Sequence, residues 1–357
     1  MKLLAIKACG LDCSLALPRG IFCSMQTFAY ALLLATQATA ATPPPRPAPS
    51  ISEDTARWWR EYPTGVRTTP IRSGRSLELF CQGKGSPTII LESGLGARMF
   101  AWRKVQPVLA RRYRVCAYNR AGIGGSSVGP TPRDAVVIVS DLEKLVRRAK
   151  LKPPYILVGH SLGGFTMRLF ARRNLHRTTG IVLVDPAAEG LLERWEAIAT
   201  DRVGPYRRLL GRFQRCTAQT DGPDCKPPPP DDAPPALHDQ WVVRRPAEWY
   251  RTMVSELQPF GPGGRNAAQI RAAGTDLEAI PLIVLTADWV PLQEELPQAQ
   301  RQAALDEVIP RHKAIAGHSR RGIQKFITGT SHDIQLDKPE AVIEAVEQVA
   351  SMARRSR

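Results

Sequence analysis

Residues 154–174 read PYILVGHSLGGFTMRLFARRN, and this stretch decides the fold. Pro154 to Val158 is a short apolar run of the kind that forms a buried strand, and we expect Leu162 to Asn174 to form a helix. The turn between them, Gly159-His160-Ser161-Leu162-Gly163, has the pattern Gly-x-Ser-x-Gly. A strand that turns this sharply into a helix holds its central serine in a strained conformation above the end of a sheet, with small residues beside it to avoid clashes. We therefore predict that Ser161 is a nucleophile.

Segments on both sides of this stretch alternate between strand-like and helix-like patterns. The expected strands are 77–80, 88–91, 113–118, 181–184, 282–285 and 322–328, and the expected helices include 102–110, 132–149 and 341–352. Such alternation is typical of a mostly parallel sheet with helices on both faces. Thr131 is expected to cap the helix that begins at Pro132.

The alternation stops between residues 187 and 275, and we interpret this stretch as an inserted cap or lid. The flanking segments 67–186 and 276–357 then form the two parts of one α/β core. The chain has 357 residues, of which 43% are hydrophobic and 23% are charged, so it can bury a sizeable core. This composition excludes a wholly disordered chain, and the lack of a fixed internal period excludes collagen, coiled-coil and solenoid architectures.

The first forty residues are typical of a secretory signal peptide. Basic residues precede the apolar stretch 28–35, and the small residues at 38–41 resemble a cleavage site. We therefore expect an exported protein, either periplasmic or secreted, with Met25 as an alternative start. Residues 41–66 are interpreted as a proline-rich linker and N-terminal segment. After residue 40, no apolar run is long enough to cross a membrane.

The chain is strongly basic, with a formal net charge of +16. Such an excess can attract anionic surfaces weakly and without specificity. No nucleic-acid-binding module accompanies the charge, so we expect no specific nucleic-acid partner and interpret the arginines as a solvated surface.

Four cysteines follow the leader. Cys216 and Cys225 flank a polar loop that a disulfide could close. Cys81 and Cys116 lie in strand-like runs, where the sequence leaves a bridge and two buried thiols equally open. None of the four has the spacing of metal ligands, so we expect no metal site.

A serine is a weak nucleophile at neutral pH and needs a base to take its proton. Among the six histidines, His332 is the best candidate. It follows the expected strand 322–328 in a polar loop and precedes the closing helix, which places the base after the serine in the chain. His160 lies inside the turn itself, and we expect His312 and His318 on the solvated surface.

Two aspartates are candidates for the acid that orients His332. Asp185 ends the strand 181–184, and Asp288 follows the strand 282–285. A carboxylate at either place would fix the tautomer of the imidazole and stabilise its charged form. The residues alone leave both candidates open, since an aspartate at a strand end can also cap a helix.

The loop Glu92-Ser93-Gly94-Leu95-Gly96 follows the expected strand 88–91. Its glycines allow the backbone to approach a substrate closely. We expect the N–H groups of Leu95 and of Leu162, the residue after Ser161, to form an oxyanion hole.

Four segments together resemble the α/β-hydrolase family, over residues 77–352. They are the turn 159–164, the loop 92–96, Tyr118-Asn119-Arg120-Ala121-Gly122-Ile123-Gly124, and Ser331-His332-Asp333-Ile334-Gln335-Leu336 before Lys338-Pro339-Glu340. The resemblance implies a mostly parallel eight-stranded sheet flanked by helices, a helical cap inserted after the sixth strand, and a Ser-His-acid mechanism without a cofactor.

The resemblance also bears on the acid. Asp185 matches the position after the sixth strand that some members use. Other members place the acid a few residues past the seventh strand, where this chain has Trp289 and Val290, and Asp288 comes slightly earlier. We therefore prefer Asp185 by a small margin.

Together these features predict a serine hydrolase that cleaves a carboxylic ester of a small molecule through an acyl-enzyme. Haloalkane dehalogenases and most epoxide hydrolases of this fold carry an aspartate at the turn, so Ser161 argues against both. Amidase, lactonase, thioesterase and carbon-carbon hydrolase activities remain alternatives, because the reaction depends on the pocket and not on the fold. A binding protein that keeps the fold without catalysis is the second class.

Overall fold

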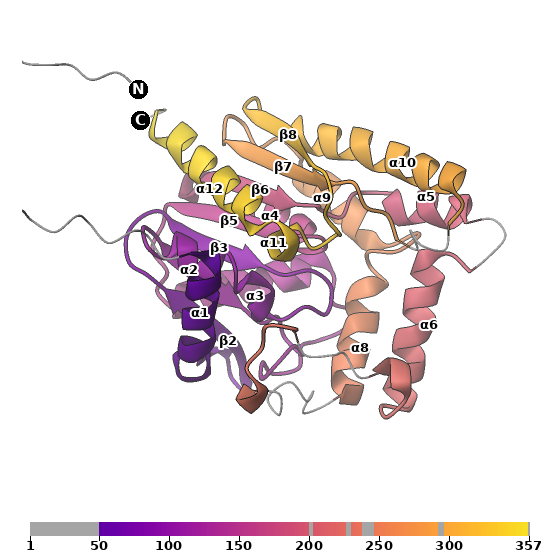
Figure 1. Cartoon of the computed structure of the whole chain (residues 1–357), viewed down its shortest axis with the longest axis horizontal. Coiled ribbons are helices and arrows are strands. Elements are labelled where there is room, and N and C mark those ends of the chain that lie inside the picture. Colours follow the sequence, from indigo (N-terminus) through magenta and orange to yellow (C-terminus); the bar gives the residue numbers. More distant parts are fainter. Residues whose placement is uncertain (1–49, 200–202, 226–229, 238–245, 292–295, 356–357) are drawn as a thin grey trace, which may run out of the picture. The chain divides into compact units, whose positions relative to one another are not determined.

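The computed structural model describes residues 50–199, 203–225, 230–237, 246–291 and 296–355. The expected signal peptide, residues 1–40, lies outside these ranges. Within them, eight strands form one sheet in the order β1-β2-β4-β3-β5-β6-β7-β8. Figure 1 shows β2, β3, β5, β6, β7 and β8 following one another in this order. The strands are β1 (Arg67–Arg72), β2 (Arg75–Gln82), β3 (Thr88–Glu92), β4 (Arg114–Tyr118), β5 (Tyr155–His160), β6 (Thr178–Val184), β7 (Leu282–Ala287) and β8 (Gly322–Ile327).

The sheet is parallel except at one edge. β1 and β2 pair in antiparallel fashion, as do β2 and β4, and each pairing from β4 through β3 to β8 is parallel. β3, β5 and β7 are buried along their whole length. Helices on both faces exclude water from such strands, which is why their sequences are continuous apolar runs without polar alternation.

Helices cover both faces of the sheet in two hydrophobic layers. One layer contains α3 (Ala135–Arg148), α4 (Gly163–Arg173) and α10 (Gln298–Ala316). The opposite layer contains α1 (Ile51–Gly65), the short helices α2 (Gln106–Leu109) and α11 (Ile334–Asp337), and α12 (Pro339–Arg354). The expected eight-stranded α/β-hydrolase architecture is thereby confirmed.

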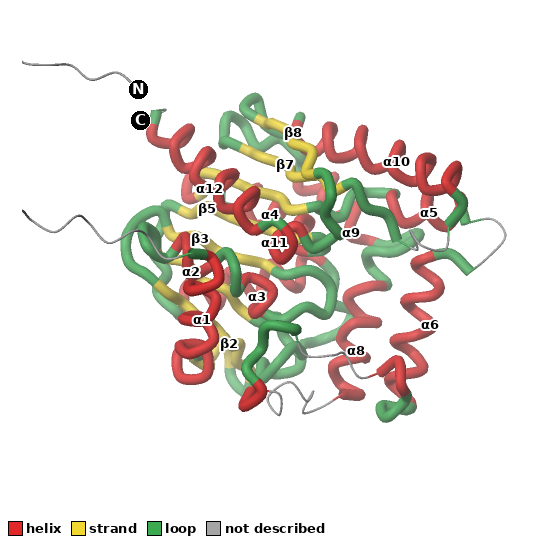
Figure 2. The backbone as a smooth tube through the Cα atoms, in the orientation of Figure 1, coloured by secondary structure: helices red, strands yellow, loops and turns green. Residues whose placement is uncertain are grey.

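In the described part of residues 187–275, Figure 2 shows helices and loops. The helices are α5 (Leu191–Ile198), α6 (Pro205–Ala218), α8 (Pro246–Leu257) and α9 (Arg265–Ala273). α6 and α8 lie side by side in Figure 1, and the rings of Phe213 and Tyr250 meet between them with centroids 6.0 Å apart. Across the described ranges, no helix combines the length and the apolar character that crossing a bilayer requires.

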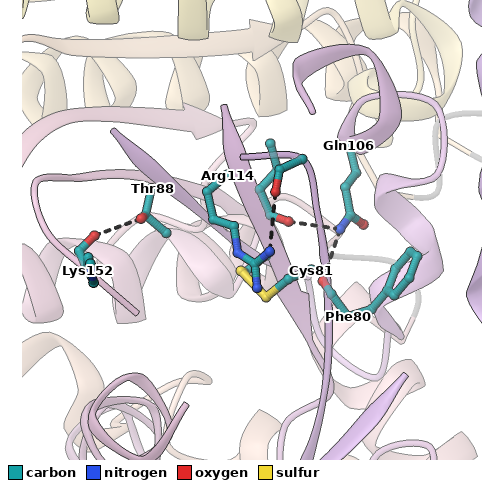
Figure 3. Close-up of a disulfide and its surroundings, with 9 residues drawn as sticks. Phe80, Cys81, Thr88, Gln106, Arg114 and Lys152 are labelled. Atoms are coloured by element: carbon teal, nitrogen blue, oxygen red, sulfur yellow. Dashed lines mark hydrogen bonds between the residues drawn. A yellow bond between two sulfur atoms is a disulfide. The ribbon is translucent and has the colours of Figure 1, made fainter. Parts of the chain in front are cut away.

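Two disulfides cross-link the chain. Cys216 and Cys225 are bridged, as the sequence indicated, and tie the end of α6 to the loop that follows it. Cys81 and Cys116 are also bridged, which decides between the two states left open. These two cysteines are direct partners in the pairing of β2 with β4. Figure 3 shows this bridge beside Gln106, whose side-chain amide donates to the carbonyl oxygen of Phe80.

Two local expectations were wrong. The expected helix 102–110 is a 3₁₀ turn, Met99–Trp102, followed by the short α2. The N-cap of α3 is Asp134 and not Thr131, because the Asp134 carboxylate accepts from the N–H of Val137 at 3.0 Å. The N–H of Arg133 is bound by the side chain of Ser255 and is thus unavailable to an earlier helical turn.

Within residues 41–66, interpreted from the sequence as a proline-rich linker and N-terminal segment, residues 51–65 form the helix α1. Ser50 and Glu53 form a capping box at its start, and Trp58 and Trp59 are buried against the sheet. The Ser-x-x-Glu spacing was a readable helix signal in the sequence.

We predict that Gly180→Ala destabilises the fold. A Cβ at Gly180 in β6 would lie 2.0 Å from Cγ1 of Val349 in α12, and a β-branched side chain inside a packed layer cannot move aside cheaply. Overpacking of this kind typically lowers the free energy of unfolding by about 1–3 kcal/mol, which urea denaturation measures.

Gly211→Ala is the matched control for Gly180→Ala. Its Cβ would meet only a flexible arginine at 3.4 Å, so helix propensity should leave stability equal or slightly higher. The double variant Gly180→Ala/Val349→Ala should lose less free energy of unfolding than the sum of the losses in the two single variants. A free energy of unfolding of Gly180→Ala equal to that of the wild type would contradict the packing described.

Candidate active site

Ser161 sits at the turn between β5 and α4 with φ of +51°, a left-handed conformation that side chains rarely adopt. Its N–H donates to the carbonyl oxygen of Val184 at 3.1 Å, and its own carbonyl oxygen accepts from the N–H of Ala187 at 2.9 Å. A Cβ at Gly163 would lie 2.6 Å from the carbonyl oxygen of Glu92, so only glycine fits there. The expected strained turn is confirmed.

Asp185 leaves the sheet beside Ser161. β5 and β6 pair with His160 opposite Val184, so the next residue of each strand emerges at the same end of the sheet. Asp185 also has a positive φ, +40°, and is buried. Its Oδ1 accepts from the N–H of Ala287 at 3.1 Å, which fixes the carboxylate against β7.

His332 reaches this end of the sheet from the loop between β8 and α11. Its Nδ1 lies 2.7 Å from Oδ2 of Asp185, and the indole of Trp289 stacks on its ring with centroids 5.1 Å apart. Burial opposes the charged form of His332, but the hydrogen bond and negative charge of Asp185 outweigh it and raise the pKa of the imidazole.

Ser161, Asp185 and His332 line one cavity. Within the described residues, Oγ of Ser161 and Nε2 of His332 are not hydrogen-bonded to each other. With Nδ1 engaged by Asp185, Nε2 is the nitrogen left to exchange a proton with a hydroxyl. Catalytic hydrogen bonds often tighten only when substrate is bound.

Asp288, the competing acid, has a different place. It is exposed and accepts from the N–H groups of Gly329 and Thr330 at 3.0 and 3.3 Å. These bonds shape the loop that carries His332, so Asp288 supports the loop while Asp185 contacts the imidazole.

Two further histidines surround these groups. His160 is buried, with Nε2 donating to the carbonyl oxygen of His332 at 3.0 Å. Burial, assisted by the charge of His332, lowers the pKa of His160 to about 4, so its ring is neutral near pH 7.

The expectation that His312 lies on the solvated surface was wrong, because α10 turns it inward. Its Nε2 donates to the carbonyl oxygen of Pro186 at 2.8 Å, and its Nδ1 accepts from the hydroxyl of Thr286 at 3.0 Å. Burial lowers the pKa of His312. A neutral imidazole thus braces the residue that follows Asp185.

Leu95 and Leu162, the expected oxyanion-hole residues, both lie next to Ser161 in the fold. Leu95 lines the cavity, and Leu162 starts the turn into α4. In the described ranges, neither backbone N–H donates to a protein acceptor. Backbone N–H groups in proteins almost always have a hydrogen-bond partner. Because these two donate to no protein acceptor, both are available to an oxygen of a bound molecule.

A buried cluster of charges holds the loop that contains Leu95. The guanidinium of Arg120 donates to the carbonyl oxygens of Ser93 and Gly94 at 2.6 and 2.7 Å. It also forms ion pairs with Glu92 at 3.0 Å and with Glu256 at 2.8 Å, and all three side chains are buried. Burial raises the pKa of Glu92, and Arg120 opposes that shift. Glu256 lies in α8, so this cluster joins the cap to the loop.

The role of Arg120 was not predicted from the sequence. Residues 118–124 indicated only a family resemblance, and an arginine surrounded by apolar segments was the available signal. Its partners lie 28 and 136 positions away in the chain, which local patterns cannot connect.

The cavity has a volume of about 510 Å³ and lies between the sheet end and the cap. The core contributes Ser161, Asp185, His332 and the loop residues Gly94 and Leu95. The cap contributes mainly apolar side chains from α5, α6 and α8. A concave, largely apolar site with a few convergent polar groups is the usual form of a small-molecule binding site.

Residues 87–218 match the protein family described as the alpha/beta hydrolase fold. The described residues have the α/β-hydrolase fold. Over 106 residues, it is 37% identical to the uncharacterized protein YqjL of Bacillus subtilis (strain 168), a match that covers 30% of this chain and 42% of YqjL. The chain spans less than half the length of the curated relatives it matches.

Two solved structures show the same fold. A thermophilic esterase of Thermogutta terrifontis is 18% identical with a TM-score of 0.52, over 81% of this chain and 98% of the esterase. The haloalkane dehalogenase DatA of Agrobacterium tumefaciens C58 is 16% identical with a TM-score of 0.56, over 81% of this chain and 96% of the dehalogenase. Because these two proteins differ in chemistry, the reaction of this α/β-hydrolase-fold chain must be argued from its own residues.

We expect Asp185→Asn to lower the pKa of His332, because the substitution removes the negative charge that favours the imidazolium. NMR titration of ¹³C-labelled histidine measures the shift, with His332→Gln to assign the resonance. Asp288→Asn is the matched control and should leave the titration of His332 in place. A shift in the control but not in Asp185→Asn would contradict the geometry.

We expect Arg120→Met to lower the free energy of unfolding by about 3–5 kcal/mol, because the buried carboxylates Glu92 and Glu256 lose the guanidinium they share. Glu92 then keeps only the hydroxyl of Tyr118, and Glu256 keeps Arg133 at 3.4 Å. Chemical denaturation measures this loss.

Arg112→Met is the matched control for Arg120→Met. Its guanidinium pairs with Glu347 at 3.1 Å but is 63% exposed, so the loss should not exceed about 1 kcal/mol. The triple variant Arg120→Met/Glu92→Gln/Glu256→Gln should recover part of the stability. Equal stability of Arg120→Met and Arg112→Met would refute the buried cluster.

Proposed function

We propose that this chain is a serine hydrolase that cleaves a carboxylic ester of a small molecule, with Ser161 as nucleophile, His332 as base and Asp185 as acid. The observation that carries the proposal is the 2.7 Å contact between His332 Nδ1 and Asp185 Oδ2 in the cavity that Ser161 also lines. A serine on a strained turn beside an imidazole oriented by a carboxylate is the arrangement that acyl transfer requires.

The proposed reaction begins when Oγ of Ser161 attacks the ester carbonyl and passes its proton to Nε2 of His332. The bond to the alcohol then breaks, and His332 returns the proton to the leaving oxygen. A water molecule, deprotonated by the same imidazole, hydrolyses the acyl-enzyme and releases the acid. Asp185 keeps Nδ1 protonated and stabilises the imidazolium in both steps.

The N–H groups of Leu95 and Leu162 are proposed to bind the oxygen that becomes negative during the attack. Backbone donors held in place in a dry site stabilise such an oxyanion without needing to reorganise. Arg120 supports Leu95 indirectly, since it binds the carbonyl oxygens of the two residues that precede it. The apolar cap side chains that line the cavity favour an acyl chain over a polar group.

We also propose that residues 1–40 direct export, an expectation from the sequence. The two disulfides of the described residues support this location, because such bonds persist in oxidising compartments.

Reaction of the purified chain with a fluorophosphonate probe, together with hydrolysis of p-nitrophenyl esters of graded length, tests the proposed activity. Ser161→Ala should abolish labelling and lower kcat/KM by at least about 10³-fold, because the nucleophile is lost. Ser140→Ala, a change on the surface of α3, should leave both intact. Faster hydrolysis of anilides or lactones than of esters would contradict an ester substrate and indicate an amidase or a lactonase. A folded chain that neither reacts with the probe nor hydrolyses any of these substrates would indicate a binding protein.

The pH profile of kcat/KM gives a second measurement. His332 accepts a proton only when neutral, and its raised pKa means that kcat/KM should rise with pH around a midpoint above 6.5. Asp185→Asn should move that midpoint down and reduce turnover by about 10⁴-fold, because the imidazole loses its orienting partner. Asp288→Asn should keep the wild-type profile, and equal mild effects of both changes would reject Asp185 as the acid.

A further inference from the structure

The cavity wall opposite the sheet end is formed by one face of α6. The side chains of Arg208, Leu209, Arg212 and Phe213 line the cavity, at the three- and four-residue spacing that places residues on one side of a helix. Arg208 and Arg212 are therefore neighbours along that face, one turn apart. The wall thus combines apolar surface with two guanidinium groups.

The guanidinium of Arg212 is held in place by a neutral group. Its Nε and Nη2 donate to the carbonyl oxygen of Asp224 at 2.9 and 2.6 Å. Asp224 precedes Cys225, and the disulfide from Cys225 to Cys216 ties this loop back to α6. A carbonyl oxygen orients a guanidinium without cancelling its positive charge, so Arg212 stays available for an anion.

Negative charge lies at the other end of the cavity. Among the described residues that line it, the carboxylates are Asp185 and Asp333. Asp185 binds His332, and Asp333 lies 3.7 Å from Nε2 of His160. The cavity is also lined by the apolar side chains of Leu95, Leu192, Trp195, Leu257 and Phe260. The cavity therefore combines the proposed reactive groups, an apolar lining and the two arginines of α6.

We propose that the substrate is an ester whose acyl chain carries a carboxylate at its far end, with Arg208 and Arg212 as the recognition site for that group. The inference rests on the proposed function and adds a substrate class to it. The apolar lining takes the methylene chain, and the guanidinium groups hold the carboxylate, for which their planar donors are suited.

The test compares p-nitrophenyl half-esters of dicarboxylic acids with neutral p-nitrophenyl esters of the same chain length. A distant carboxylate hardly changes the intrinsic reactivity of the ester, and alkaline hydrolysis rates correct for what remains. The measured quantity is the ratio of kcat/KM for the anionic ester to that for the neutral ester. We expect the ratio to fall about tenfold in Arg208→Gln/Arg212→Gln, the loss of a charge-assisted contact, while turnover of the neutral ester is retained.

Arg215→Gln is the matched control, because this arginine is exposed on the same helix and does not line the cavity. It removes general positive charge and should leave the ratio unchanged. Added salt should lower the ratio in the wild type and not in the double variant. A ratio that is equal in the wild type and in Arg208→Gln/Arg212→Gln would overturn the inference, while turnover of the neutral ester would leave the proposed function standing.

A binding measurement tests the same site without turnover. In Ser161→Ala, calorimetry with monomethyl suberate and dimethyl suberate compares ligands that differ in one carboxylate. We expect tighter binding of the monoanion, and loss of the difference when Arg208 and Arg212 are both changed to Gln. Equal affinity for the two ligands would refute the anion site, whether or not the chain hydrolyses esters.

Discussion

The parallel pairing of β5 with β6 is the constraint on which the site depends. It sets His160 opposite Val184, so that Ser161 and Asp185 leave the sheet together, each with a positive φ. The hydrogen bond from Ser161 N–H to Val184 joins the two turns. His332 then needs only to arrive from the loop after β8 to meet a carboxylate whose position the sheet has already fixed. Strain at two adjacent turns is tolerated because the surrounding buried strands offer no alternative backbone path.

The buried charged and titratable groups form two regions with different roles, one near Ser161 and one around Arg120. Near Ser161, Asp185 raises the pKa of His332, while burial keeps His160 and His312 neutral. One imidazole can therefore change its charge while its neighbours serve as fixed hydrogen-bond partners. Farther along, Arg120 balances two buried carboxylates, an arrangement that contributes little net stability but is costly to break. The loop that carries Leu95 is bound to this balanced group.

The sequence predicted those parts of the fold that are local. The strand, the turn and the helix around Ser161 are contiguous, and the place of His332 follows from chain order. The acid could not be chosen locally, because Asp185 and Asp288 both follow strands and differ only in what their carboxylates contact. His312 was misjudged because its charged neighbours suggest a surface, whereas it lies on the buried face of α10 together with Val308 and Ile315. The partners of Arg120 were invisible because only tertiary structure brings them together.

The attachment of Glu256 to Arg120 has a consequence for how a molecule reaches the cavity. Swinging α8 away from the sheet would separate buried opposite charges, a step that costs about 3–5 kcal/mol before any contact of apolar surface is lost. α8 is therefore expected to stay in place when a molecule enters the cavity. By contrast, Arg194 of α5 pairs with Glu307, and Arg207 of α6 pairs with Glu196, and both arginines are exposed. Such pairs separate at little cost, so a molecule is expected to enter the cavity on the side of α5 and α6.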